Sequence, residues 1–341
     1  MKVAIIIVTY NGSKYIARCL TSVFSNKYEN FTVLVVDNNS ADDTVEIVGK
    51  LFPQVELIKL DSNLGFVGGN NIGIKRALQD GADCIILLNQ DTEVEYDWLA
   101  QLVKTAQENK KAGIIQAMLL LAEERSLTNN VGNAMHYLGF GFVKHYRERV
   151  DSWFHRSPFE IGYASGAAML ITREVLEKVG ALDEKFFMYH EDLDLCWRAR
   201  LTGYKIMIAP QAVVYHHYQF NRNKKMFYWT ERNRWACLLQ NYSWTTLLKL
   251  APILILIEMM MLAYSLSGGW LVQKLKSYAW VIKYFKLIMR QRERVQLMRQ
   301  LSDKEVMRHM DAKLEFTEVS NPVLKWIVSP IAEWYYKLIA S

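Results

Sequence analysis

Three acidic residues, Glu191, Asp192 and Asp194, stand within four positions of one another and have aromatic residues on either side. A carboxylate among aromatic neighbours has its charged form disfavoured, so its pKa rises toward the range in which it accepts a proton from a hydroxyl. The cluster therefore predicts a general base. The competing interpretation is that Asp192 or Asp194 caps a helix over residues 195–201.

A short polar segment, Asn89-Gln90-Asp91, follows an apolar strand-like run at residues 84–88. An amide and a carboxylate two residues apart at the end of a strand point the same way and present two oxygen ligands to one cation. Mg²⁺ or Mn²⁺ would fit, and such ions leave positions free for phosphate oxygens, which implies a diphosphate ligand. The alternative is an Asx turn before a helix over residues 97–108.

Other polar residues follow buried strand-like runs near the start of the chain. The runs at residues 3–9 and 31–36 are continuous and β-branched, as in strands buried on both faces of a parallel sheet, and helical patterns follow them. This order predicts an α/β fold. Ligands of open α/β sheets bind beyond the carboxyl ends of the strands, which is where Thr9, Tyr10 and Asp37 fall. A turn-forming role is the alternative for Asp37.

A glycine-rich stretch precedes a predicted helix over residues 70–78. Gly68, Gly69 and Asn70 would let backbone N–H groups approach a phosphate at the helix N-terminus. The spacing fits neither the dinucleotide-binding fingerprint nor a P-loop, which disfavours NAD-dependent enzymes and simple NTPases. A plain loop is the alternative.

The net charge of +6 is unevenly distributed. Residues 1–220 contain 22 Lys and Arg against 26 Asp and Glu, whereas residues 221–341 contain 19 against 9, together with seven of the ten Trp. A basic, tryptophan-rich segment is typical of a surface that contacts anionic lipid, and it contains no motif for reading nucleic acid. We expect a catalytic domain at 1–220 and a helical, membrane-associating region at 221–341.

Residues 247–266 are apolar over about the length that spans a bilayer, but Lys249, Pro252 and Glu258 interrupt the run. We expect a helix that lies in the membrane interface or packs beside it. Residues 274–300 have the pattern of a basic amphipathic helix, with an ordinary surface helix as the alternative. Four widely spaced cysteines indicate a reducing compartment, and the N-terminal run lacks the pattern of a secretory signal.

Six motifs together resemble those of the inverting glycosyltransferases of family 2. They are VTYN at 8–11, VVDNNSADDT at 35–44, NLGFVGGNN at 63–71, LLNQDTEV at 87–94, ASGAAMLITREVLEKVGALDEKFF at 164–187 and HEDLDLCWRAR at 190–200. They occur in the family's order and cover the proposed catalytic domain. Within the family, the likeness is greatest to rhamnosyltransferases that build bacterial surface polysaccharides.

The resemblance implies a GT-A fold, with a mostly parallel mixed sheet flanked by helices, a nucleotide-sugar donor and a divalent metal. Asp91 matches the metal-binding aspartate of the family's DxD element, whereas Asn89 stands where the first acid is expected and is a weaker ligand. The positions expected to bind the donor are Thr9, Tyr10, Asn11, Asp37, Gly68, Gly69, Asn70, Asn89 and Gln90.

The same resemblance assigns the later residues. Asp192 matches the base that deprotonates the acceptor hydroxyl, and Glu191 would orient it. His216 or His217 matches a late histidine that completes the metal site; His216 is the candidate, although the sequence leaves the choice open. Independently of the resemblance, the small residues around Ser165 and Gly166 permit close approach of a sugar, with tight packing against the sheet as the alternative. These two residues and Trp197 are expected to contact the acceptor. The loose pattern of residues 111–163 is typical of a variable lobe over the acceptor site.

The sequence thus predicts an inverting glycosyltransferase, peripheral or monotopic on the cytoplasmic face of a bacterial membrane, in cell-wall polysaccharide synthesis. Its donor would be a dTDP-, UDP- or GDP-sugar, with rhamnose or a related hexose favoured, and its acceptor a lipid-linked saccharide. Two alternatives remain. One is a nucleotidyltransferase, which also places acids at strand ends; the other is a non-catalytic membrane scaffold with a degenerate pocket, which Asn89 favours.

Overall fold

The computed structural model describes residues 1–218, 224–315, 322 and 324–340. The elements before the first gap are β1 (Val3–Thr9), α1 (Ile16–Phe24), β2 (Phe31–Asp37), α2 (Thr44–Leu51), β3 (Glu56–Lys59), α3 (Gly65–Gln79), β4 (Cys84–Asn89), β5 (Thr92–Val94), α4 (Trp98–Glu108), β6 (Ala112–Leu121), β7 (Thr128–Asn130), β8 (Asn133–Met135), β9 (Gly141–Val143), α5 (Asp151–Phe154), β10 (Phe159–Glu160), β11 (Ala168–Thr172), α6 (Arg173–Val179), α7 (Glu191–Leu201) and β12 (Lys205–His216). The later elements are α8 (Lys224–Asn241), α9 (Trp244–Ser267), α10 (Leu271–Lys283), α11 (Phe285–Met298), α12 (Asp303–Met307), the π-helix η1 (Leu324–Val328) and α13 (Ser329–Ala340).

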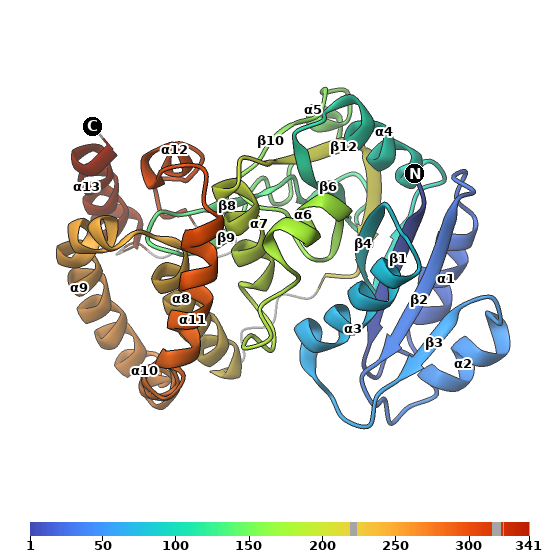
Figure 1. Cartoon of the computed structure of the whole chain (residues 1–341), viewed down its shortest axis with the longest axis horizontal. Helices are drawn as coiled ribbons and strands as arrows, with labels where there is room; N and C mark the ends of the chain where they lie inside the picture. The colour runs from blue at the N-terminus through green and yellow to red at the C-terminus, as the bar shows by residue number, and fades with distance from the viewer. Residues whose placement is uncertain (219–223, 316–321, 323, 341) are drawn as a thin grey trace.

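A single large mixed sheet organises the first part of the chain (Figure 1), and this confirms the predicted α/β class. Its strands follow the order β10-β12-β6-β11-β4-β1-β2-β3, with β5 paired to β12 and β7 paired to β6. Strands β4, β1, β2 and β3 are parallel to one another, while β11 runs antiparallel to both of its neighbours. The carboxyl ends of β1, β2 and β4 therefore meet at one edge.

Both faces of the sheet are covered at its centre, which is why central strands such as β1 and β4 are continuously apolar rather than alternating. Along β1, Ile5 and Ile7 belong to the core shared with α1 and α4, whereas Ala4 and Ile6 belong to the core shared with α3, α6 and α7. Successive side chains of a strand point to opposite faces, so one buried run supplies both cores.

The expectation of a variable lobe at residues 111–163 is wrong in part. Strand β6 lies within this segment, has all ten residues buried and pairs with β11 on one side and β12 on the other. The rest of the segment carries β7 to β10, including the separate two-stranded sheet of β8 and β9.

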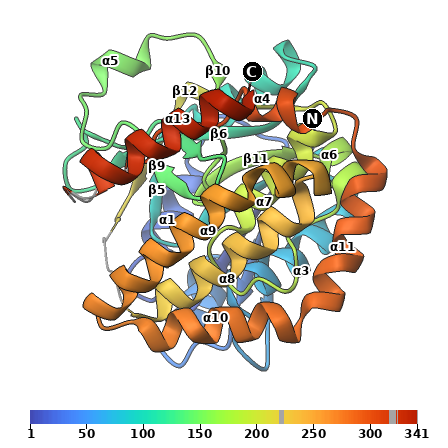
Figure 2. The same ribbon diagram turned by 90° about the vertical axis from the view of Figure 1, so that its left-hand side faces the viewer.

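The helices after residue 223 pack against the end of the molecule that carries α7 (Figures 1 and 2). Helix α8 contacts α7, α10 and α11, and α11 also reaches α6. The division expected at residue 220 falls among residues 219–223, which lie outside the described part of the chain.

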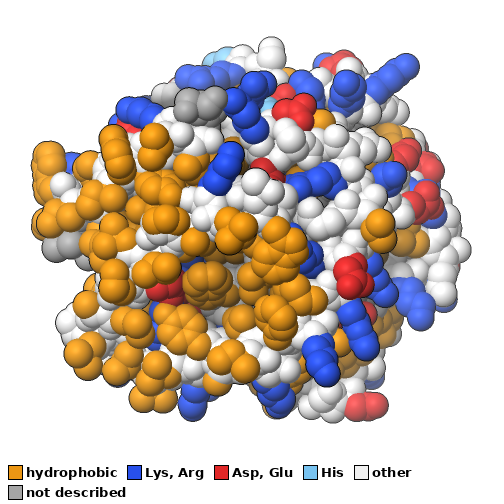
Figure 3. Space-filling view, turned by 60° about the vertical axis from the view of Figure 1, so that its left-hand side comes forward, with side chains coloured by type: hydrophobic (Ala, Val, Ile, Leu, Met, Phe, Trp, Pro, Cys, Tyr) orange, Lys and Arg blue, Asp and Glu red, His pale blue; other side chains and the backbone are white. Residues whose placement is uncertain are grey.

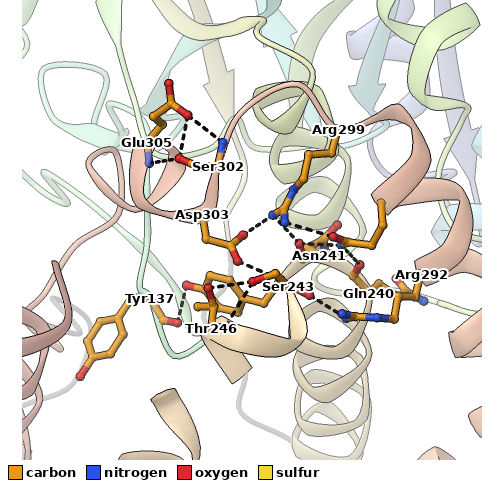
Figure 4. A network of polar contacts seen from close by, with 12 residues as sticks. Tyr137, Gln240, Asn241, Ser243, Thr246, Arg292, Arg299, Ser302, Asp303 and Glu305 are labelled. Carbon is orange, nitrogen blue, oxygen red and sulfur yellow. Dashed lines mark hydrogen bonds and ion pairs between the residues drawn. The ribbon is translucent and has the colours of Figure 1, made fainter. Parts of the chain in front are cut away.

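Polar contacts hold the turn between α8 and α9 against α11 and α12 (Figure 4). The Asp303 carboxylate accepts a hydrogen bond from the Ser243 backbone N–H at 2.8 Å and pairs with Arg299, which also donates to the Asn241 carbonyl at 3.1 Å. Arg292 of α11 donates to the Tyr242 carbonyl at 2.6 Å. Because the side chain of Asn241 contacts α7, these contacts link the C-terminal helices to the acidic cluster.

A buried group of charged side chains joins α8, α9 and α10. Arg234 pairs with Glu231 at 3.1 Å and with Glu258, and Lys274 pairs with Glu258 at 2.7 Å and with Glu231. Burial alone would raise the pKa of Glu231, but Arg234 and Lys274 outweigh it and lower that pKa to about 2. Glu258, the acid that interrupts the apolar run of α9, therefore belongs to an internal network of two acids and two bases.

Candidate active site

Polar residues from three loops gather at the carboxyl edge of β1, β2 and β4. Thr9 pairs in register with Asp37, and Val8 pairs with Asn89. The side-chain oxygen of Gln90 accepts hydrogen bonds from the Thr9 hydroxyl at 2.5 Å and from the Tyr10 backbone N–H at 3.1 Å. The structure therefore brings these five sequence-selected residues together.

Asp37 keeps an unused acceptor in this group. It is 2% exposed, and one carboxylate oxygen accepts a hydrogen bond from the Ser40 N–H at 3.0 Å. Its other oxygen, Oδ1, is buried without a partner among the described residues. Asn11 ties the neighbouring loops together, because its side-chain oxygen accepts from the Ala41 N–H at 2.9 Å. An unpartnered buried acceptor costs free energy unless a ligand supplies a donor.

Gly68, Gly69 and Asn70 do not form the expected loop. Helix α3 begins at Gly65, so all three lie inside the helix. A Cβ at Gly69 would stand 2.7 Å from Val8 Cγ1, and the buried Asn70 side chain donates to the Phe66 carbonyl within its own helix. Gly69 instead allows close packing of α3 on β1, so the plain loop that was the alternative is not formed either.

Asp91 and His216 face each other across the β5–β12 pairing. His216 pairs in register with Thr92, and its Nε2 lies 3.5 Å from Asp91 Oδ1. Burial would raise the pKa of Asp91, but the hydrogen bond and charge of His216 outweigh it and hold that pKa below its usual value. The sequence left two histidines open, and His216 is the one whose side chain reaches Asp91.

His217 points elsewhere. Its ring nitrogens lie 3.0 Å from Glu93 and 3.0 Å from Glu123, while its backbone N–H donates to the Asp91 carbonyl. Adjacent strand residues point to opposite sides, so only one member of the pair can face the acid.

Asn129 contacts the candidate metal-binding histidine, and the sequence analysis missed it. Its side-chain oxygen lies 3.0 Å from His216 Nδ1, on the side of the ring away from Asp91. In the neutral ring, with that oxygen accepting the Nδ1 proton, Nε2 has a lone pair that can take a cation in place of the hydrogen bond to Asp91. Such an outer hydrogen bond is the usual way to orient a metal-binding histidine. The signal was the polar run Thr128-Asn129-Asn130 inside a segment to which no chemistry was assigned.

The pair of Asp91 and His216 fits a divalent cation, although it provides only two ligands. No group of three His, Cys, Asp or Glu side chains able to hold a metal occurs in the described residues. Mg²⁺ and Mn²⁺ sites in phosphate-transferring enzymes commonly use one or two protein ligands and complete their coordination with substrate phosphates and water.

Asp192 lies in the first turn of α7, where its carboxylate has two backbone donors. Oδ2 accepts from the Gly166 N–H at 3.1 Å and Oδ1 from the Leu193 N–H at 2.8 Å. Burial raises the pKa of Asp192 to about 6, and these backbone hydrogen bonds limit the rise. A carboxyl with this pKa is ionised at neutral pH and still basic enough to take a proton.

Glu191, directly before it, is 7% exposed, and its Oε2 atom has no partner within the described structure. Burial and the neighbouring charge of Asp192 raise the pKa of Glu191 well above its usual value. Two adjacent buried carboxyls rarely ionise together, and Glu191 is the harder of the two to ionise.

Asp194 has a different partner. Arg198 donates from Nε to Asp194 Oδ2 at 2.7 Å, and both side chains are 0% exposed. Asn241 donates to the other oxygen at 2.9 Å. The third acid of the cluster is thus enclosed in an ion pair. Helix α7 begins at Glu191, with His190 as the N-cap, so the competing interpretation, in which an aspartate caps a helix over residues 195–201, is wrong.

The segment from Gly166 into β11 connects the acidic cluster to the strand-end group, the polar residues at the carboxyl ends of β1, β2 and β4. Asp192 contacts the Gly166 N–H, and the carbonyl of the next residue, Ala167, accepts from the Asn89 N–H at 2.9 Å. Asp91 follows two residues later. The base candidate, held by the residues just before β11, and the cation candidate, which follows β4, therefore lie near the same edge of the sheet, because β11 and β4 are neighbouring strands.

The expected acceptor contacts are only partly compatible with the structure. Gly166 adjoins Asp192, and the neighbouring Ser165 N–H donates to Gln116 at 2.8 Å. Trp197 does not fit, because its indole is 0% exposed and packs edge to face on Tyr242 with ring centroids 4.7 Å apart. An acceptor sugar cannot touch a side chain that is enclosed in the core.

The chain was compared with known proteins. The family model described as "Glycosyl transferase family 2" matches residues 4–180. The sequence is 25% identical over 234 residues to an N-acetylglucosaminyl-diphospho-decaprenol L-rhamnosyltransferase of Mycobacterium tuberculosis, covering 62% of this chain and 75% of the other. It is 27% identical over 214 residues to the dTDP-rhamnosyl transferase RfbF of Shigella flexneri, covering 62% and 67% of the two chains.

Among solved structures, GalNAc-T7 with UDP, GalNAc and Mn²⁺ superimposes with a TM-score of 0.57 at 15% identity, covering 70% of this chain and 48% of that one. At that identity the likeness shows the fold alone, which is of the GT-A type. The matched residues 4–180 make up more than half of the chain and contain the strand-end group. The chain belongs to glycosyl transferase family 2 and is a glycosyltransferase.

Proposed function

We propose that this enzyme transfers a sugar, rhamnose or a related hexose, from a nucleotide-diphosphate donor to a hydroxyl of a lipid-linked saccharide in bacterial surface polysaccharide synthesis. The observation that carries the proposal is the position of Asp192, a carboxyl with a raised pKa on the same sheet edge as Asp91 and Asp37. Two relatives named for rhamnosyl transfer, one of them acting on a decaprenol-linked sugar, support the donor and acceptor classes.

In this proposal Asp192 is the general base. Its carboxylate takes the proton of the acceptor hydroxyl as that oxygen attacks the anomeric carbon from the face opposite the diphosphate, so one displacement inverts the anomeric centre. The N–H groups of Gly166 and Leu193 hold the carboxylate in place. Glu191, uncharged, leaves a single negative charge beside the reacting hydroxyl.

The donor would lie along the ends of β1, β2 and β4. The unpartnered Asp37 Oδ1 suits an N–H of the nucleobase or a hydroxyl of the ribose, because a buried acceptor gains most from a ligand donor. Thr9, Tyr10 and Gln90 would form the wall beside it. Because Gly68, Gly69 and Asn70 lie inside α3, their role in this proposal is to pack that helix beside the donor site.

Asp91 and His216 would hold a Mg²⁺ or Mn²⁺ ion, which when bound offsets the charge of the departing diphosphate. Asn89 is a neutral amide where an acid is more usual, so the pair has little charge of its own to attract the cation. We therefore expect metal and donor to bind together.

A lipid-linked acceptor would be held in the membrane, so the enzyme would need a surface that binds there. Helix α9 is long and apolar enough to cross a bilayer, and only 28% of its most apolar window is buried. Among the described residues, 16 of the 22 exposed large hydrophobic side chains lie after residue 240. Figure 3 shows them covering much of one face, with Lys and Arg at its border. We propose that this face lies in the cytoplasmic interface of the membrane.

The test is direct transfer. The protein is incubated with Mn²⁺, a prenyl-diphosphate-linked saccharide and each of dTDP-rhamnose, UDP-sugars and GDP-sugars in turn. The expected result is one donor that yields a glycosylated lipid with inverted anomeric configuration. A product with retained configuration, or nucleotidyl transfer with release of pyrophosphate, would contradict the proposal. The proposed membrane face is checked by sedimentation with vesicles. The protein should sediment with anionic vesicles and stay in solution with zwitterionic ones.

A further inference from the structure

A cavity of about 530 Å³ lies between α8, α9 and η1. Most of its lining is apolar, and it includes Phe227 from α8 and Ile257, Met260 and Met261 from α9. Its volume is in the range of small-molecule pockets, about 300–1,000 Å³. Methionine side chains adapt to irregular shapes, so this lining suits a flexible hydrocarbon chain.

One polar residue of the lining adjoins the acidic cluster. His190 belongs to the lining and directly precedes Glu191 at the start of α7. Its ring nitrogen Nε2 contacts the Gly139 carbonyl at 3.1 Å, which fixes it beside the loop that leads to Gly141, another lining residue. The charged members Glu231 and Arg234 are paired with each other. The cavity therefore reaches the N-terminus of the helix that carries Asp192.

The opposite side of the cavity leads to the exposed apolar face. Tyr264 lines the cavity and is also 40% exposed, so the cavity wall continues onto the surface. On the outer side of α9, Ile255 is 61% exposed and Met259 is 56% exposed. Figure 3 shows this face as a largely hydrophobic surface with basic side chains around it.

We propose that this cavity receives the hydrocarbon chain of the lipid that carries the acceptor. A chain entering from the apolar face along α9 would bring the head of the lipid toward α7, where a hydroxyl can meet Asp192. The inference rests on the proposed function, because it names the place of the acceptor's lipid portion. A bulk phospholipid has no reason to reach the start of α7, and this separates the two possible occupants.

The test uses decaprenyl phosphate with a diazirine in its chain, added to the full-length protein on nanodiscs, followed by mapping of the cross-linked residues. The expected labels fall on cavity residues such as Phe227 and Met260. Met260→Trp fills the cavity, and by displacing the equivalent of about two methylenes it should lower this labelling roughly tenfold. Met259→Trp, the exposed neighbour on α9, is the matched control and should label as the wild type does.

Competition identifies the ligand. Unlabelled decaprenyl phosphate should suppress the cavity labels, and phosphatidylglycerol at the same concentration should not. Labels confined to exposed residues, equal competition by phosphatidylglycerol, or equal loss in both variants would overturn the inference. Sugar transfer is measured separately: transfer without cavity labels overturns the inference alone, and cavity labels without transfer from any nucleotide sugar overturn the proposed function alone.

Discussion

Asp192 and Asp194 lie two residues apart in the first turn of α7, yet their carboxylates have opposite surroundings. Asp192 accepts only backbone N–H groups, from Gly166 at 3.1 Å and Leu193 at 2.8 Å, and its pKa rises to about 6 with burial. Asp194 is enclosed with Arg198, whose Nε is 2.7 Å away. One acid is left free to exchange a proton, and the other is held in a permanent ion pair.

Removal of the Asp194 partner should therefore affect stability. Arg198→Met leaves a buried carboxylate without its cation, which typically costs about 3–5 kcal/mol. Urea unfolding should show this loss. The double variant Asp194→Leu/Arg198→Met should recover only part of it, because Asn241 and the carbonyls of Val179 and Ala181 also lose their partners. Equal stability of wild type and Arg198→Met would mean that the pair is not formed in solution.

The pH dependence of catalysis should report Asp192. Below a pH of about 6 its carboxyl is protonated and cannot accept a proton, so kcat/KM should fall about tenfold per pH unit on the acidic side. A rate that is flat between pH 5 and 7, on a protein shown to stay folded, is incompatible with this base.

The same pKa has an effect of opposite sign on stability. Burial raises the pKa of Asp192 from 3.8 to about 6, so its contribution to stability is complete below pH 3.8 and is lost as the pH rises through 6. The variant Asp192→Asn has no carboxyl at this position, so its stability does not fall for this reason as the pH rises. The difference in unfolding free energy between variant and wild type should therefore shift in favour of the variant between pH 4 and pH 7.

Glu191→Gln tests whether Glu191 is uncharged. Glutamine has the shape of a protonated glutamate, so this variant should keep kcat within about tenfold of wild type and hardly shift the pH profile. Glu191→Ala, which removes the side chain, should lower kcat more than Glu191→Gln does. A loss in Glu191→Gln as large as in Asp192→Asn would show that Glu191 works as a carboxylate.

His216→Ala should raise the Mn²⁺ concentration needed for half-maximal activity by about tenfold or more, because it removes one of two protein ligands. His217→Ala, whose side chain contacts Glu93 and Glu123 instead, is the control and should leave this concentration unchanged. If His217→Ala raised the required Mn²⁺ concentration and His216→Ala did not, His216 would not be the metal ligand.

The strand ends were predictable because buried parallel strands have a simple pattern. Continuous β-branched runs placed Thr9 and Asp37 at one edge, and the structure has them in register. The start of α3 was not predictable from propensity, since glycine usually marks loops. This helical position holds glycine because a larger side chain at Gly69 would collide with Val8, and no local pattern reveals such a contact between elements.

Long-range contacts also explain the other differences. Trp197 lies next to the acids in sequence, but its indole faces the core and Tyr242. The role of Asn129 depends on β7 lying beside β6, and β6 beside β12, which carries His216. Glu258 looked like an interruption of an apolar helix, and its partners Arg234 and Lys274 come from two other helices. Such pairings are fixed by tertiary packing, so single-sequence patterns cannot supply them.

The most direct test of the account is the turnover of Asp192→Asn, with donor binding measured on the same preparation. The account predicts a loss of about a hundred- to ten-thousandfold in kcat, because proton transfer by a positioned base contributes that much, while the affinity for the nucleotide-sugar donor is nearly unchanged. Turnover close to wild type in this variant would contradict the assignment of Asp192 as the base.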